Sequence, residues 1–149
     1  ELFTGGIFFG MSEDNMWKIL AQPRVMIGSD ASIRSPIGPL SHDHPHPRAY
    51  GTFGRFLRAA LDGKTVGVGE AVRKMTSLPA EHFRLKDRGV LRAGAFADVV
   101  ALDPKTFRDV ATYEKPHQFC EGISAVWVNG TATLRDGKDT GARGGRYLG

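Results

Sequence analysis

The side chain with the clearest capacity for chemistry is the carboxylate of Asp30, which follows the apolar run of residues 25–28 and Ser29. An aspartate directly after a strand is commonly a turn former or a helix cap. In a parallel α/β barrel, however, the carboxyl ends of the strands carry the active site. If residues 24–28 form such a strand, Asp30 points into the catalytic mouth of the barrel.

Three histidines, His42, His44 and His46, occupy alternate positions in the segment SHDHPHPR. Histidines two residues apart on a strand project to the same face and can share a zinc ion. Pro45 and Pro47 interrupt this alternation, and their presence is typical of a loop, so shared zinc ligation is the less favoured interpretation. The alternative is a solvated polar loop that includes His42 and His44.

The segments before Asp30 predict a strand, a helix and a second strand. Residues 6–10 form a short apolar run between glycines, which is typical of a buried strand. Ser12 is a good N-cap for a helix that Pro23 ends. Residues 24–28 form the second apolar run, and this order is that of a βαβ unit in a parallel sheet.

A long loop, rich in proline, separates these elements from the rest of the chain and spans residues 31–47. Periodicity then predicts helices over residues 53–61, 69–77 and 79–85, followed by strands over residues 99–102, 124–128 and 131–134. Asn129 and Gly130 between the last two strands are the strongest short signal for a hairpin. The last third of the sequence is therefore expected to be a small β-module.

Composition places the chain among ordinary soluble globular proteins, with 41% hydrophobic and 24% charged residues. The net charge of +4 is spread without any basic run, which argues against a nucleic-acid partner. The single cysteine, Cys120, excludes an intrachain disulfide and a cysteine zinc cluster, and favours a cytoplasmic protein. No apolar run approaches the ~20 residues that a membrane span needs, and no signal peptide is expected.

Several blocks of the sequence, taken in order, resemble the D-aminoacylase branch of the amidohydrolase superfamily, the N-acyl-D-amino-acid deacylases. The most distinctive blocks are HPR-x-YGTF and the terminal TGAR-x-GR, and the ADVV segment is common to many amidohydrolases. The remaining blocks are GSDAS, AVRKMTSLPAEHFRLKDRGVLRAG and PHQFCEGISAVWVNG. Gly54 stands where the family pattern leads us to expect proline.

This resemblance implies a metal-dependent hydrolase, with zinc, on a (β/α)8 barrel beside a β-sandwich that both chain ends build. The fold class is thus α/β: residues 1–85 would supply the last βα units of the barrel, and residues 86–149 part of the sandwich. The implied reaction cleaves N-acyl-D-amino acids to a carboxylate and a free D-amino acid. The main metal ligands of the family come from earlier strands, so the chain alone is expected to be inactive.

The resemblance also assigns roles to individual residues. Asp30 would approach the metal, take a proton from the water bound to it and pass that proton to the leaving amine. Arg48 would grip the α-carboxylate of the substrate with both arms of its guanidinium, and His46 would orient this loop. Phe8 and Met11 would line the side-chain pocket of the substrate, with plain core packing as their alternative.

Two other interpretations stay open at this point. One is a different amidohydrolase chemistry, such as a cyclic amidase or a deaminase, although those enzymes need no carboxylate clamp. The other is a non-catalytic β-module or assembly domain. If the chain is cut from a longer barrel, we expect it, when made alone, to self-associate, to swap elements or to leave residues 1–24 poorly ordered, because edges and apolar faces are left uncovered. Its natural partner would be the N-terminal half of the barrel.

Overall fold

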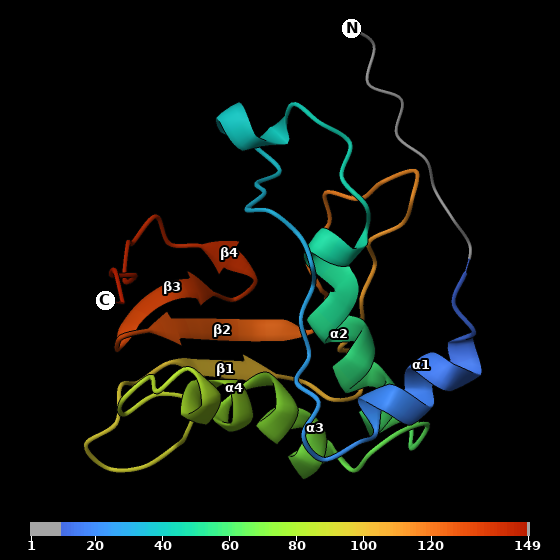
Figure 1. The fold of residues 1–149 in the computed structure, drawn as a ribbon. Helices are drawn as coiled ribbons and strands as arrows, with labels where there is room; N and C mark the ends of the chain where they lie inside the picture. The colour runs from blue at the N-terminus through green and yellow to red at the C-terminus, as the bar shows by residue number, and fades with distance from the viewer. Residues whose placement is uncertain (1–9, 149) are drawn as a thin grey trace, which may run out of the picture.

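The computed structural model describes residues 10–148, in which helices come first and a small sheet follows (Figure 1). In this view α3 and α4 run beneath the strand β1, and α2 stands beside one end of the sheet. The predicted strand at residues 6–10 and the pocket residue Phe8 lie outside the described residues, except for Gly10, which is in irregular backbone. None of the helices in the described range is long and apolar enough to cross a membrane.

The first predicted helix is confirmed as α1, Glu13–Leu20. Ser12 is its N-cap, and the side-chain oxygen accepts a hydrogen bond from the backbone N–H of Asn15 at 3.4 Å. Acidic residues in the first turn complement the positive end of the helix dipole. The helix ends three residues before Pro23 in the sequence, as the lack of a proline N–H requires.

The prediction of a strand over residues 24–28 is wrong for this structure, in which the segment has no strand partner. Its polar backbone groups bond to α3 instead: the N–H of Ile27 donates to the carbonyl of Lys74 at 3.3 Å. The buried ammonium of Lys74 in turn donates to the carbonyls of Gln22 and Val25. A strand is defined by its neighbour, and the part of the chain that the structure describes contains no parallel neighbour for this segment.

The helix α2, Arg48–Leu61, begins five residues before the predicted start at residue 53. Pro47 occupies its N-cap position, and the carbonyl of Pro47 accepts hydrogen bonds from Tyr50 at 3.1 Å and Gly51 at 2.9 Å. The prediction followed apolar periodicity, which starts at Phe53. The actual start is set by proline, whose ring fixes φ at a helical value. Arg48 is therefore the first residue of a helix and not part of a loop.

The other two predicted helices are confirmed with shifted ends, as α3, Val68–Met75, and α4, Ser77–His82. Small residues let α2 and α3 approach closely, and a compact apolar cluster fills the space between them. Its buried members and the partly buried side chains around it are Ile27, Phe56, Ala60, Ala71, Trp17, Leu20, Val66 and Met75. This cluster anchors the segment that leads to Asp30 against the helices.

The predicted β-module is one antiparallel sheet of four strands in the order β1-β2-β3-β4. The strands are β1, Val99–Leu102; β2, Ile123–Val128; β3, Thr131–Arg135; and β4, Lys138–Asp139. The hairpin prediction is confirmed, because Asn129 and Gly130 both have positive φ, 51° and 80°, as a type I′ turn requires. A second turn of this kind, at Asp136 and Gly137, adds β4, a strand that the sequence patterns do not predict.

Between β1 and β2 the chain makes a long excursion, residues 103–122, which we call the connector. It lies along α2, and two glycines of that helix allow the close approach: a Cβ atom at Gly51 would fall 2.4 Å from the carboxylate of Asp109, and one at Gly54 would fall 2.3 Å from the sulfur of Cys120. Figure 1 shows the connector in orange reaching past the N-terminal end of α2. It thereby meets the loop at residues 31–47.

Candidate functional site

Asp30 and Arg48, the two residues predicted to carry the chemistry, form an ion pair. Nη2 of Arg48 lies 2.8 Å from Oδ2 of Asp30, across the two ends of the loop at residues 31–47. Asp30 has a positive φ of 48°, a conformation that aspartate tolerates better than most residues. The side chain of Asp30 is 88% exposed and that of Arg48 is 47% exposed. Both groups are thus open to a ligand on one face.

His46 is held on both sides of its ring. Its Nδ1 accepts a hydrogen bond from the backbone N–H of Arg48 at 3.0 Å, and its Nε2 lies 3.0 Å from the hydroxyl of Tyr113. A nitrogen that accepts an N–H carries no proton, so the neutral ring has its proton on Nε2, which donates to Tyr113. Burial and the positive charges of Arg48 and Arg55 lower the pKa of His46, which favours this neutral form.

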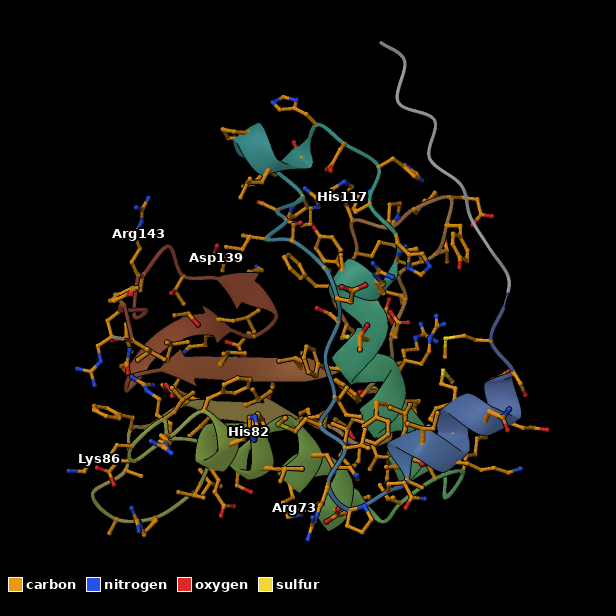
Figure 2. All side chains as sticks on the ribbon, viewed as in Figure 1. Arg73, His82, Lys86, His117, Asp139 and Arg143 are labelled. Atoms are coloured by element: carbon orange, nitrogen blue, oxygen red, sulfur yellow. The ribbon has the colours of Figure 1, made fainter. Side chains whose placement is uncertain are left out.

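A second histidine, His117 from the connector, makes a parallel pair of contacts beside the first. Its Nδ1 lies 2.9 Å from the hydroxyl of Tyr50, and its Nε2 donates to the carbonyl of Asp43 at 2.8 Å. The ring of Phe119 packs edge-on against Tyr50 with 5.4 Å between centroids. The pKa of the Tyr50 hydroxyl is raised, mainly by burial. The charge of Asp43 also raises this pKa, and the charge of Arg34 opposes the shift. Figure 2 shows His117 near the N-terminal end of α2.

The other two histidines of the loop do not form a metal site with His46. The Nε2 of His44 lies 2.5 Å from the carbonyl of Tyr113, and His42 is exposed. Among residues 10–148 no group of three or more histidine, cysteine, aspartate or glutamate side chains is arranged to hold a metal ion. The described residues therefore do not make a zinc site by themselves, and the exposed carboxylate of Asp30 is chemically suited to be one ligand of a site completed elsewhere.

Met11, predicted to line a substrate pocket, is 79% exposed in the segment before α1. It does not line either of two cavities found among the described residues, and the linings of these two cavities do not include Asp30, His46 or Arg48. The pair is an open surface constellation in this chain.

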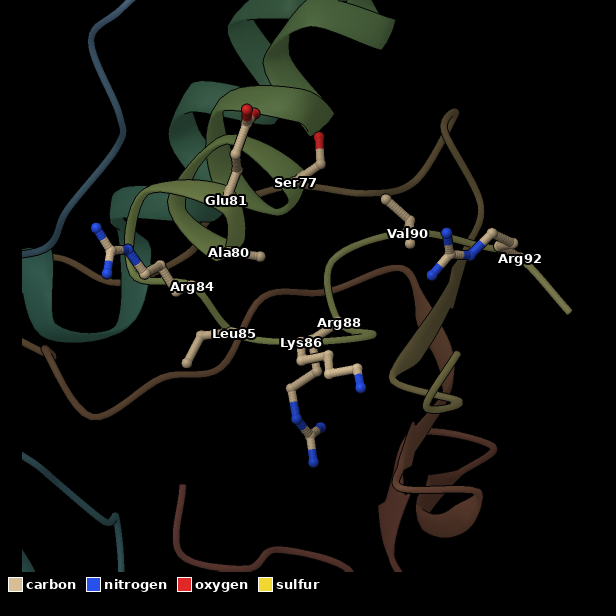
Figure 3. Close-up of a pocket in the computed structure, with 9 residues that line it drawn as sticks. All are labelled: Ser77, Ala80, Glu81, Arg84, Leu85, Lys86, Arg88, Val90 and Arg92. Atoms are coloured by element: carbon tan, nitrogen blue, oxygen red, sulfur yellow. The ribbon is translucent and has the colours of Figure 1, made fainter. Parts of the chain in front are cut away.

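The larger cavity, about 760 Å³, lies between the helices and the sheet and is mostly apolar. Its lining includes Phe53 and Val72 from the helices and Val100 from β1. The smaller one, about 450 Å³, lies against α4 and the turn that follows, and four of its residues are cationic: Arg84, Lys86, Arg88 and Arg92. Figure 3 shows the guanidinium of Arg84 on the opposite side of this pocket from that of Arg92, while Arg88 is paired with Asp98, so the cations do not converge on one point.

Residues 16–133 match a model of the amidohydrolase family, and the chain therefore belongs to that family. Over 147 residues it is 44% identical to the D-aminoacylase of Alcaligenes xylosoxydans xylosoxydans, an alignment that covers 97% of this chain and 29% of that protein. A solved structure of D-aminoacylase with a binuclear metal centre superimposes with a TM-score of 0.78 at 42% identity, covering 89% of this chain and 27% of that one.

A further solved relative is the N-acyl-D-glutamate deacylase of Bordetella bronchiseptica, in complex with zinc and a phosphonate that mimics the tetrahedral intermediate of the reaction. It matches with a TM-score of 0.73 at 41% identity over 83% of this chain and 25% of that one. The chain thus spans between a quarter and a third of the length of the relatives it matches. The resemblance inferred from the sequence blocks is confirmed, whereas the roles of single residues stay predictions.

Sequence patterns do not single out Tyr113 or His117, which the structure places against residues on either side of Arg48. Neither residue stands in a pattern that indicates chemistry, because their partners lie 67 to 74 positions away in the sequence. The one signal for His117 is its place in the block PHQFCEGIS, and from sequence this block supports only the family resemblance.

Proposed function

We propose that this chain is part of a zinc-dependent amidohydrolase that cleaves the amide bond of N-acyl-D-amino acids. The observation that carries the proposal is the contact between Asp30 and Arg48, a proton acceptor and a carboxylate-binding group held 2.8 Å apart. Relatives that are 40–44% identical carry the names D-aminoacylase, N-acyl-D-aspartate deacylase and N-acyl-D-glutamate deacylase, which supports this substrate class. Neither a cyclic amidase nor a non-catalytic module has a comparable observation in its favour.

The reaction would use the two side chains in different ways. Water adds to the acyl carbonyl carbon, and Asp30 accepts a proton from that water. Asp30 later donates this proton to the amine nitrogen as the C–N bond breaks. The products are a carboxylate and a free D-amino acid. The planar fork of Arg48 would bind the α-carboxylate of the substrate and so fix the stereocentre relative to Asp30. Arg48 would exchange its partner on binding, from Asp30 to the substrate.

Zinc, when bound, would polarise the carbonyl group and make the attacking water more acidic. Asp30 would be its one ligand from this chain, and the others would come from the rest of the full-length protein. In that protein residues 1–85 would complete the end of a (β/α)8 barrel, and residues 86–149 would form part of a β-sandwich. Phe8 and Met11 would then face the substrate pocket, and His46 would orient the loop. A cytoplasmic location is part of this proposal, in keeping with the single cysteine among these 149 residues.

The test is a kinetic comparison of variants of the full-length protein, with zinc content measured for each. Asp30→Asn should lower kcat by about 10²–10⁴-fold because it removes the proton acceptor. Arg48→Lys keeps the charge but loses the bidentate fork, and should raise KM by about tenfold or more. The control Asp14→Asn, in the exposed first turn of α1, should leave both constants unchanged. Unchanged kinetics in Asp30→Asn and Arg48→Lys would refute the assignment.

A further inference from the structure

We propose that Tyr113 and His117 of the connector are positioning residues for Arg48, and that the connector thereby sets the affinity for the substrate carboxylate; this inference rests on the proposed function. The connector belongs to the sheet module, and Arg48 to a helix of the other part of the chain. Neither Tyr113 nor His117 reaches Asp30 or the guanidinium of Arg48 itself. Each acts through residues of the loop and of the first turn of α2.

The first link runs from Tyr113 through His46 to Arg48. The hydroxyl of Tyr113 lies 3.0 Å from Nε2 of His46, whose Nδ1 accepts the backbone N–H of Arg48 at 3.0 Å. The two rings also pack edge-to-face with 5.0 Å between centroids. This N–H belongs to the first turn of α2, where backbone donors have no partner within the helix. His46 therefore fixes the helix start that carries Arg48, and Tyr113 fixes His46.

The second link holds the chain on either side of this point. His117 contacts the carbonyl of Asp43 at 2.8 Å and the hydroxyl of Tyr50 at 2.9 Å, and the carbonyl of Tyr113 contacts Nε2 of His44 at 2.5 Å. Together with the contact between Tyr113 and His46, these contacts attach residues 43–50 to the connector at four residues, three before Arg48 and one after it. Because the chain is attached on both sides of Arg48, the backbone of Arg48 has little freedom to move.

The connector can serve as a support because it is braced within itself and against α2. The side-chain amide of Gln118 donates to the carbonyls of Val110 at 2.7 Å and Lys115 at 2.8 Å, which closes the tip of the excursion. At its base Arg108 pairs with Glu121 at 2.6 Å. The nearly buried carboxylate of Asp109 accepts from Arg55 of α2 at 3.0 Å. The support is therefore tied to the same helix whose first residue it positions.

Such support has a functional consequence because a bidentate grip on a carboxylate depends on geometry. Two parallel N–H···O bonds require that one edge of the guanidinium point at the two carboxylate oxygens with the planes of both groups aligned, so a small tilt of the helix start weakens both bonds together. A substrate that has no carboxylate makes no such demand. Loss of the support should therefore lower kcat/KM for the substrate with an α-carboxylate and leave kcat/KM for a neutral analogue unchanged.

The experiment compares Tyr113→Phe with the wild type in the full-length, zinc-loaded protein. Two substrates are used, an N-acetyl-D-amino acid and the same compound with its α-carboxylate replaced by a carboxamide. Tyr113→Phe keeps the ring packed on His46 and removes only the hydroxyl. We expect the ratio of kcat/KM for the acid to kcat/KM for the amide to fall by about tenfold, mainly through KM of the acid. His117→Gln should lower the same ratio.

The matched control is Tyr147→Phe, because Tyr147 is 93% exposed in the C-terminal segment. It should leave the ratio unchanged. If both substrates lose activity in equal proportion in Tyr113→Phe, or if neither does while the wild type is active, the positioning role is wrong and the proposed function stands. If the wild type hydrolyses neither substrate, the proposed function is wrong, and the positioning role is refuted with it.

Discussion

At the residue scale, His46 makes the stability of the loop depend on pH. Its Nδ1 can accept the N–H of Arg48 only while it is unprotonated, and its pKa lies below the ordinary value of 6.5 because of burial and the charges of Arg48 and Arg55. A histidine with a lowered pKa in the folded state contributes stability that is complete above about 6.5. That contribution is lost as the pH falls through the lowered value, since the unfolded chain takes up the proton first.

The difference in free energy of unfolding between the wild type and His46→Gln isolates this contribution, because the other titrating groups are common to both. We expect the difference to be constant above pH 6.5 and to shrink at lower pH, as measured by thermal unfolding at a series of pH values. A difference that grows toward acid would contradict the assigned proton position. His42, which is exposed, supplies the control variant His42→Gln, for which no such trend is expected.

Much of the candidate site at this scale could be predicted from the sequence, whereas the connector residues that contact the loop beside it could not. Asp30 and Arg48 could be named because they stand in distinctive blocks, and the structure brings their side chains together. Tyr113 and His117 could not, because a hydrogen bond between residues about 70 positions apart leaves no local pattern. The surface around Asp30 could not be inferred at all, because a side chain's exposure depends on which elements pack beside it.

At the scale of elements, the contact between α2 and the connector depends on the absence of a side chain at Gly54. An added Cβ would lie 2.3 Å from the sulfur of Cys120, too close for any real contact. Gly54→Ala should therefore destabilise the protein by about 1–3 kcal/mol, despite the better helix propensity of alanine. In a Cys120→Ala background the sulfur is gone, and the next contacts are an ordinary 3.6 Å to Cβ of Asp109 and 3.7 Å to Cβ of residue 120, so most of the loss should disappear.

Chemical denaturation of the four proteins in this double-mutant cycle gives the coupling free energy directly. The control is Gly69→Ala in α3, where nothing lies within 4 Å of the added Cβ; it should be neutral or stabilising. Equal losses for Gly54→Ala in both backgrounds would show that the sulfur is not the obstacle. The presence of glycine at this position, where the family pattern leads us to expect proline, would then not be explained by the close approach of Cys120.

The elements that the sequence predicted well are those with purely local determinants. The N-cap of α1 and the Asn129-Gly130 turn are fixed by residues within four positions of each other. The apolar run at residues 24–28 is different, because its periodicity fits a strand while its hydrogen bonds go to the buried Lys74 and its helix. Whether such a run becomes a strand is decided by a neighbouring strand, which its own sequence does not contain.

At the scale of the whole molecule, helices and sheet meet only loosely. A mostly apolar cavity of about 760 Å³ separates α2 and α3 from the sheet, and β1 is an edge strand with unpaired backbone groups. Val100 of β1 is 55% exposed, and Phe53 and Val72 on the facing helices are 45% and 42% exposed. Uncovered apolar surface next to a free strand edge is a common route to association. Relatives several times longer than this chain have further polypeptide that could cover it.

We therefore expect the 149-residue chain, when produced alone, to self-associate as its concentration rises, and sedimentation velocity over a concentration series measures this. Val100→Lys should weaken the association, because burying a lysine amine without a partner is costly and a charge on an edge strand disfavours pairing. Ile33→Lys adds the same charge in the loop, away from the cavity, and should leave association unchanged. A monomer at all concentrations would mean that helices and sheet close on one another in solution, and that the cavity needs no further chain to fill it. Equal effects of the two lysine substitutions would instead show that association depends on the net charge of the chain and not on contacts made by β1.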